Sequence, residues 1–347
     1  MSNSFLPSVL AKMKRELINK LGVSSENISE LFFGEIKPDV KFTVIKKVSD
    51  SLVASNFHAI TAHDESHFFQ SRHLISTESV SVDTKTGVVF DGNSRILAES
   101  TSWPKESVIL NVLPKPPRKL KTLEIDVQNQ VLVMPSNGFY HWLIEDLPLF
   151  LKTLNTLSNP KVLVFEDAYK YVYDFLDGMN IPYVKVPRFI KTSHFYFITH
   201  GNDTGWPHPE DLSELDRISL PMSIKDNSAE KVYISRRGSS RSPSFEEKLE
   251  NDLRNKNWRI VKLEDLSFWD QVDLASQAKT ICGVHGAGLS SATWMSAGTK
   301  IIELGSSRHV PCFSRLASSK NISYKLIRFE EVSYSHLLND IVDYSNK

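Results

Sequence analysis

The second half of the chain alternates short apolar runs with longer stretches whose apolar residues recur every three or four positions. The runs predict buried strands, and the longer stretches predict amphipathic helices between them. We expect strands at residues 231–235, 258–263, 280–284, 300–304 and 324–329, and helices at 245–255, 267–276, 289–296 and 334–344. Continuous apolar strands separated by helices are typical of a parallel sheet covered on both faces.

The stretch before it repeats this pattern. Strands are expected at residues 130–134, 161–165, 183–186 and 195–198, and helices at 141–157, 168–179 and 211–220. Pro148 lies inside the first of these helices, where it predicts a kink or a break near the first turns. The middle of the chain therefore also predicts a parallel α/β unit.

Residues 30–120 have a different texture, with short alternating segments between turn residues. This pattern predicts a small, mostly β portion, including a hairpin that pairs residues 87–90 with 94–97. Residues 1–22 predict an amphipathic helix that either docks on the protein's own core or touches a membrane surface.

The predicted fold class is α/β, with two Rossmann-like domains that face a cleft. The length of 347 residues suits two domains. The expected boundaries are 1–221 for the N-terminal domain (helix 1–22, β-rich 30–120, Rossmann-like 121–221), 222–230 for a linker, 231–330 for the C-terminal domain and 331–347 for a terminal helix. Ligands bind between the domains in such architectures.

Composition limits the function classes. The net charge of zero gives no global field that favours nucleic acid. The chain contains no run of 18 apolar residues, so no membrane span is predicted, and the N-terminus lacks the apolar core of a signal peptide. We therefore expect a cytoplasmic protein, with reduced cysteines at its two cysteine positions.

The segment 280–304 contains the first candidate site, a tight loop between a strand and a helix. Gly286 and Gly288 allow close backbone approach, and the helix N-terminus offers unpaired N–H groups to an anion. With His285 as a further donor, the loop predicts a phosphate or diphosphate cradle. The alternatives are a packing loop and an esterase oxyanion loop, but the chain has no Gly-x-Ser-x-Gly nucleophile motif.

The second candidate site is the stretch 137–148. His141 and Glu145 are four residues apart, so they share one face of the predicted helix. They can form a general-base pair, with Asp146 beside them. The alternative is a satisfied, partly buried histidine beside a solvated carboxylate.

Two further groups lie at strand ends. Arg236 and Arg237 follow the strand 231–235, where an arginine can bind phosphate oxygens, although a solvated basic turn would look the same. Glu303 ends the strand after the glycine loop and can accept ribose hydroxyls or remain a strand-end charge in solvent. The chain has no Asp-x-Asp pair, so a nucleotide-sugar enzyme with this sequence would neutralise its leaving diphosphate with arginine, histidine and helix dipoles.

Together these stretches resemble glycosyltransferase family 61 over about residues 130–305. The matching residues are Asn137, His141, Trp142, Glu145, Leu147 and Pro148, then Ser235–Arg237, Glu246, Glu247, Phe268, Gln271, His285–Leu289, Glu303 and Leu304. The family usually has Asp where this chain has Glu145, and Thr-Asn where it has Ser290-Ser291.

The resemblance implies a GT-B architecture and an inverting, metal-independent transfer from a nucleotide sugar, expected to be UDP-linked, to an oligosaccharide or lipid-linked glycan. No cofactor or metal is expected. The C-terminal domain would hold the donor and the N-terminal domain the acceptor, with helix 331–347 packing back on the N-terminal domain. The implied catalytic residues are Glu145, His141 and Asp146; the donor-binding residues are Arg236, Arg237, His285, Gly286, Ala287, Gly288, Leu289 and Glu303; the acceptor-binding residues are Asn137, Tyr140 and Trp142.

Bacterial relatives imply a role in capsule or lipopolysaccharide synthesis at the inner face of the membrane, with contacts to the membrane periphery or to a polysaccharide-synthesis complex. Two other classes stay open. One is a non-catalytic nucleotide-sugar or glycan-binding module of such a complex. The other is a nicotinamide-dependent enzyme, against which the absence of a Gly-x-Gly-x-x-Gly motif argues.

Overall fold

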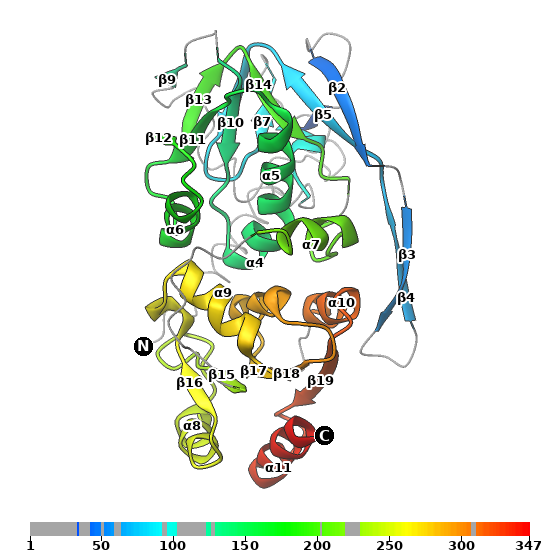
Figure 1. Cartoon of the computed structure of the whole chain (residues 1–347), viewed down its shortest axis with the longest axis vertical. Helices are drawn as coiled ribbons and strands as arrows, with labels where there is room; N and C mark the ends of the chain where they lie inside the picture. Colours follow the sequence, from blue (N-terminus) through cyan, green and yellow to red (C-terminus); the bar gives the residue numbers. More distant parts are fainter. Residues whose placement is uncertain are drawn as a thin grey trace, which may run out of the picture.

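The computed structural model describes residues 33–34, 42–49, 52–58, 64–91, 96–102, 123–125, 129–201, 203–218, 230–306 and 310–347. The predicted helix at 1–22 and residues 222–229 of the predicted linker lie outside them. The described chain is a mixed α/β structure, with its N-terminal half at the top of Figure 1 and its C-terminal half at the bottom.

In the described residues of the C-terminal half, five parallel strands form one sheet in the order β16-β15-β17-β18-β19. The strands are β15 (Lys231–Ile234), β16 (Arg259–Val261), β17 (Thr280–Val284), β18 (Lys300–Gly305) and β19 (Ser323–Arg328). Successive residues alternate between two apolar clusters, as Val232 and Tyr233 do. The sheet is therefore covered on both faces, as its continuous apolar strands predict.

Helices cover the two faces of this sheet. The face toward the N-terminal half carries α9 (Phe268–Gln277), the 3₁₀ helix η5 (Ala287–Trp294) and α10 (Cys312–Ser319). The other face carries α8 (Glu246–Arg254) and α11 (Tyr334–Asn346), and a short 3₁₀ turn, η4, spans Leu263–Asp265. We expected the terminal helix to return to the N-terminal domain. Leu337 and Ile341 of α11 instead pack with Leu249 of α8 and Ile327 of β19, because these residues complete the outer apolar face of the C-terminal sheet.

The N-terminal half contains the other predicted parallel strands, in the sheet order β12-β11-β10-β14-β5-β2. Their bounds are β2 (Phe42–Ser49), β5 (Arg72–Thr77), β10 (Val131–Met134), β11 (Lys161–Phe165), β12 (Tyr183–Val186) and β14 (Phe195–Ile198). The strands β10, β11, β12 and β14 are parallel, as predicted, whereas β5 and β2 extend the sheet in antiparallel order. Two strands from the β-rich portion thus belong to the α/β sheet.

A second sheet, in the order β1-β8-β7-β6-β13-β9, packs on one face of the first through a shared apolar cluster. Its strands are β1 (Phe33–Gly34), β6 (Val80–Asp83), β7 (Val89–Phe90), β8 (Ile96–Leu97), β9 (Leu123–Glu124) and β13 (Phe189–Thr192), and a 3₁₀ turn, η1 (Ala98–Ser100), follows β8. The predicted hairpin is confirmed, since β7 and β8 pair antiparallel. A separate hairpin of β3 (Leu52–His58) and β4 (Asp64–Phe69) extends beside α10.

The opposite face of the α/β sheet is covered by helices, several of which lie next to the C-terminal half in Figure 1. They are α4 (Phe139–His141), the π-helical turn η3 (Trp142–Asp146), α5 (Leu147–Thr156), α6 (Lys170–Gly178) and α7 (Pro209–Leu215). The single helix predicted at 141–157 is thus interrupted. Leu147 N–H donates to Trp142 O, five residues back, immediately before Pro148, which has no N–H to donate.

The two halves share one apolar cluster. The buried Trp142 ring lies 5.4 Å from the ring of Phe268 on α9, and Phe175 of α6 lies 6.0 Å from Trp269. The Trp269 indole N–H also donates to the Asp174 carbonyl. Among the described helices, none is long and apolar enough to cross a membrane.

Substitution of Gly178 by alanine tests the contact between α6 and α9. A Cβ atom at Gly178 would lie 1.9 Å from Trp269 Nε1, so the indole must move and lose its packing. We expect Gly178→Ala to lower the free energy of unfolding by about 1–3 kcal/mol, measured by denaturant titration. Gly138→Ala is the control, because its nearest heavy atom would be 4.0 Å away, at His141 Cδ2. Equal midpoints for both variants would contradict the proposed packing.

Candidate functional site

Each α/β sheet has a switch point, which is the position where the chain connections lead to neighbouring strands on opposite sides. In the N-terminal half β11 and β14 flank β10, and in the C-terminal half β16 and β17 flank β15. Ligands of open parallel sheets bind outside the carboxyl ends of the strands at such switch points. The loops that leave β10 and β17 lead into α4 and η5, which contact each other. The two switch points therefore face each other, and His141, Arg236 and His285 lie beside them.

The Glu145 carboxylate is the centre of the first cluster, and its side chain is only 2% exposed. It accepts hydrogen bonds from Ser102 Oγ (2.9 Å), Thr204 Oγ1 (2.9 Å) and Gly205 N–H (2.7 Å). Burial raises its pKa, but the hydrogen bond and charge of His141, with the Gly205 and Thr204 donors, lower it below its ordinary value. The alternative of a solvated carboxylate is therefore excluded, because Glu145 is buried and ionised.

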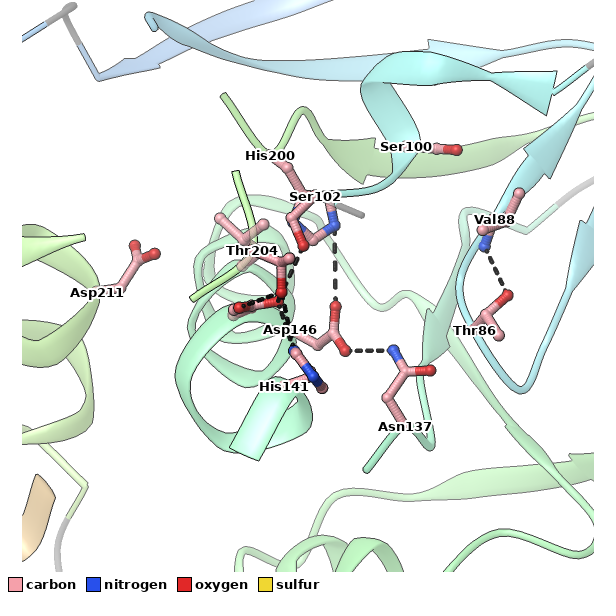
Figure 2. Close-up of polar contacts among 12 residues, drawn as sticks. Thr86, Val88, Ser100, Ser102, Asn137, His141, Asp146, His200, Thr204 and Asp211 are labelled. Carbon is pink, nitrogen blue, oxygen red and sulfur yellow. Dashed lines mark hydrogen bonds and ion pairs between the residues drawn. The ribbon is translucent and has the colours of Figure 1, made fainter. Parts of the chain in front are cut away.

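His141 lies beside this carboxylate, with Nδ1 3.1 Å from Glu145 Oε2 and 3.1 Å from Thr204 Oγ1 (Figure 2). An ionised carboxylate only accepts, so Nδ1 carries the proton and Nε2 is the basic nitrogen of the neutral ring. Burial lowers the pKa of His141, but Glu145 and Asp146 raise it more, and the net pKa is above its ordinary value. The imidazole is 34% exposed, so within this pair His141 is the member that reaches solvent.

Asp146 has a different environment from Glu145, although the π turn brings both side chains inside. Asn137 Nδ2 donates to Asp146 Oδ2 at 2.6 Å, and His200 Nε2 lies 3.8 Å from Oδ1 (Figure 2). Burial raises the pKa of Asp146 to about 8 and lowers that of His200 to about 4, so both side chains are neutral at pH 7 and do not form an ion pair. Both line a cavity of about 50 Å³, large enough for water.

The predicted acceptor-binding residues lie in three different settings. Trp142 is completely buried in the apolar cluster between the halves, so it supports the site from beneath. Asn137 is 6% exposed and bonds to Asp146. Tyr140 packs edge-on against Phe313 of α10 at 5.6 Å, and its buried hydroxyl has no hydrogen-bond partner among the described residues. The Tyr140 hydroxyl is therefore unsatisfied within the described part of the chain and closed to solvent in this conformation.

On the C-terminal side, Arg236 lies across the glycine loop. Its Nη1 donates to the carbonyl oxygen of His285. A Cβ atom at Gly286 would lie 2.2 Å from Arg236 Nη1, so the glycine is needed for this approach. Gly288 faces Ile234 and Leu263, and Leu289 is 1% exposed. The loop therefore packs closely and also places a guanidinium at the η5 N-terminus, beside Ala287.

Arg237 points elsewhere. Its guanidinium pairs with Glu247 (3.8 Å) and with Glu250 (3.5 Å) of α8. Glu250 also accepts from Ser235 Oγ at 2.5 Å, and Glu246 accepts from Arg236 N–H at 2.6 Å. The first turn of α8 thus fixes the backbone after β15, and Arg236 is the arginine of the pair that faces the glycine loop.

Glu303 has a role that the sequence did not indicate. Its side chain is completely buried, which excludes both a solvated strand-end charge and, in this conformation, direct contact with a ribose. His285 Nδ1 lies 2.5 Å from Glu303 Oε1, and Tyr324 OH donates to Oε2 at 2.6 Å. The carboxylate therefore orients His285, whose side chain is 25% exposed.

Several contributing residues were missed by sequence reasoning. They are Ser102, Thr204, Gly205, His200 and Phe313, which lie in loops or on the unpredicted helix α10. From the sequence, the stretch 200–209 was interpreted only as a loop between the two halves of the chain. Among the residues that the structure describes, no group of three or more His, Cys, Asp or Glu side chains is arranged to hold a metal ion.

Residues 139–302 match the family described as Glycosyltransferase 61. The matched segment begins in α4 and ends in β18, so it contains His141, Glu145, Arg236 and His285 from both switch points. The match supports glycosyl transfer as the activity and agrees with the resemblance seen in the motifs. A search of curated proteins found no match to the chain.

The neutral Asp146 gives a test of the site's electrostatics. The folded state holds the Asp146 proton up to about pH 8, whereas an unfolded Asp loses it near 3.8. Between these values the folded state binds more protons, so this contribution to stability falls as pH rises. Asp146→Asn removes this pH dependence of stability. The melting temperature of the variant should exceed that of the wild type at about pH 7.5, and the difference should be smaller at about pH 5. An equal difference at both pH values would contradict a protonated Asp146.

Proposed function

We propose that the protein is a glycosyltransferase that moves a sugar from a nucleotide-sugar donor to a glycan acceptor with inversion at the anomeric carbon. One observation carries the proposal: two histidine–carboxylate pairs lie beside switch points that face each other, each with a buried acid and a partly exposed imidazole. The pairs are His141–Glu145 and His285–Glu303. One can deprotonate an acceptor while the other contacts the departing diphosphate.

His141 is the proposed general base. Its Nε2 accepts the proton of the acceptor hydroxyl as that oxygen attacks the anomeric carbon and the bond to the nucleotide diphosphate breaks. Glu145 keeps the Nδ1 proton in place and stabilises the imidazolium that forms, as the acid does in other histidine–carboxylate pairs. Glu145 itself is too buried to reach an acceptor.

The donor is proposed to bind on the C-terminal side. The Arg236 guanidinium, His285 and the amides at the start of η5 would neutralise the leaving diphosphate, which supports a metal-independent reaction. The acceptor is proposed to lie over His141 and Tyr140. Two α/β sheets with facing switch points support a GT-B arrangement.

The finer assignments rest on the family resemblance. We propose a UDP-linked donor and an acceptor in a bacterial surface polysaccharide, either capsule or lipopolysaccharide. The reaction would take place in the cytoplasm at the inner face of the membrane.

A thermal-shift panel of UDP, CMP, GDP, dTDP and NAD tests the donor site. We expect one nucleotide to raise the melting temperature of the wild type, because a ligand that binds only the folded state stabilises it. Arg236→Ala should lose this shift, while Arg237→Ala, whose guanidinium pairs with α8, should keep it. No shift with any nucleotide, or equal loss in both variants, would contradict the donor site.

Steady-state kinetics with the donor so identified test the base. His141→Ala should lower kcat about 10²- to 10⁴-fold while the nucleotide shift is retained. In the wild type, kcat/KM should rise with pH through a pKa above the ordinary value of 6.5, because the pKa of His141 is raised. Glu145→Gln should lower kcat and shift the rise of kcat/KM to lower pH. A bound donor with no turnover in the wild type would indicate a binding module, and unchanged turnover in His141→Ala would exclude His141 as the base.

A further inference from the structure

The loop at residues 203–208 is the segment that links the candidate base to the C-terminal half. On one side, Thr204 Oγ1 and Gly205 N–H donate to Glu145. Gly205 has a φ of +83°, a conformation that glycine adopts without strain. The position of these two donors therefore depends on how the loop is held.

Arg315 of α10 holds the loop from the other side. Its guanidinium carbon lies 3.4 Å from the centroid of the Trp206 ring, and its Nη1 donates a long hydrogen bond of 3.4 Å to Gly205 O. The backbone of Gly205 is thus held on both sides: its N–H donates to Glu145, and its carbonyl accepts from Arg315. A planar guanidinium can stack on an indole and donate at its edge, which a lysine cannot do in the same way.

The same helix also touches the donor side. Phe313 of α10 packs against the His285 ring at 5.4 Å and against the Tyr140 ring at 5.6 Å. One short helix of the C-terminal half therefore contacts the histidine proposed to meet the diphosphate and the loop that holds the proposed base.

We propose that Arg315 is a positioning residue for the transfer reaction: by clamping Trp206 and Gly205 it holds Glu145, and through Glu145 it orients His141. This inference rests on the proposed function. It makes the geometry of the base, which belongs to the N-terminal half, depend on a helix of the C-terminal half. Arg315 touches neither substrate in this scheme and acts through the loop.

The first test needs no substrate. Hydrogen–deuterium exchange of the full chain should show that a peptide covering 203–208 exchanges about 2- to 30-fold faster in Arg315→Met than in the wild type, because the cation–π contact that closes the loop is lost. Trp206→Leu removes the other partner and should give the same result. Arg315→Lys should lie between Arg315→Met and the wild type.

Lys320→Met is the matched control. Lys320 lies at the C-terminal end of α10 and pairs with Asp216, a residue outside the loop, across the two halves. Exchange of 203–208 should be unchanged in this variant. Unchanged exchange in Arg315→Met, or equal acceleration in Lys320→Met, would overturn the clamp.

The second test measures turnover with the donor found in the nucleotide panel. Arg315→Met should lower kcat about tenfold or more with little change in the donor KM, since a misplaced base slows the reaction rather than donor binding. Faster exchange with unchanged kcat would overturn the positioning role. Absence of turnover in the wild type would instead defeat the proposed function, and the two failures are distinguishable because the exchange test uses no substrate.

Discussion

The buried carboxylate of Glu145 is the constraint on which the arrangement of the N-terminal site depends. An unpaired charge at this depth would be strongly unfavourable, so the fold must bring it donors. They come from Ser102 in the β-rich portion, from His141 one turn earlier, and from the loop at Thr204–Gly205. Satisfying one anion thus fixes three distant segments relative to each other, and the orientation of an imidazole follows from it.

The C-terminal half solves the same problem with different elements. Glu303 is buried at the end of β18 and is satisfied by His285 from the preceding strand end and Tyr324 from the next strand. Here the donors come from parallel neighbours in one sheet, whereas Glu145 lies on a helix and gathers loops. Both solutions leave a histidine partly exposed at a switch point, and α10 touches both sides through Phe313 and Arg315.

Sequence patterns predicted the strands well because β10, β17 and β18 are largely apolar runs in two sheets that are each covered on both faces. They also singled out His141, Glu145, Arg236 and His285 as candidates from compact local motifs, and the fold brings these residues to the two switch points. They missed the partners of Glu145, since Ser102, Thr204 and Gly205 are 43, 59 and 60 positions away and no local spacing reveals such contacts. The burial of Glu303 was invisible in the sequence for the same reason: burial is a property of the assembled sheet.

The aromatic contacts between Trp142 and Phe268, and between Phe175 and Trp269, limit how the halves can move. A wide hinge opening would expose these rings to water, at a cost of about 25 cal/mol for each Å² of apolar surface. Small sliding of packed helices keeps such rings covered. Admission of the proposed donor would therefore proceed by small sliding of α9 and α10 along α4 and α6, with the aromatic rings between the halves still covered.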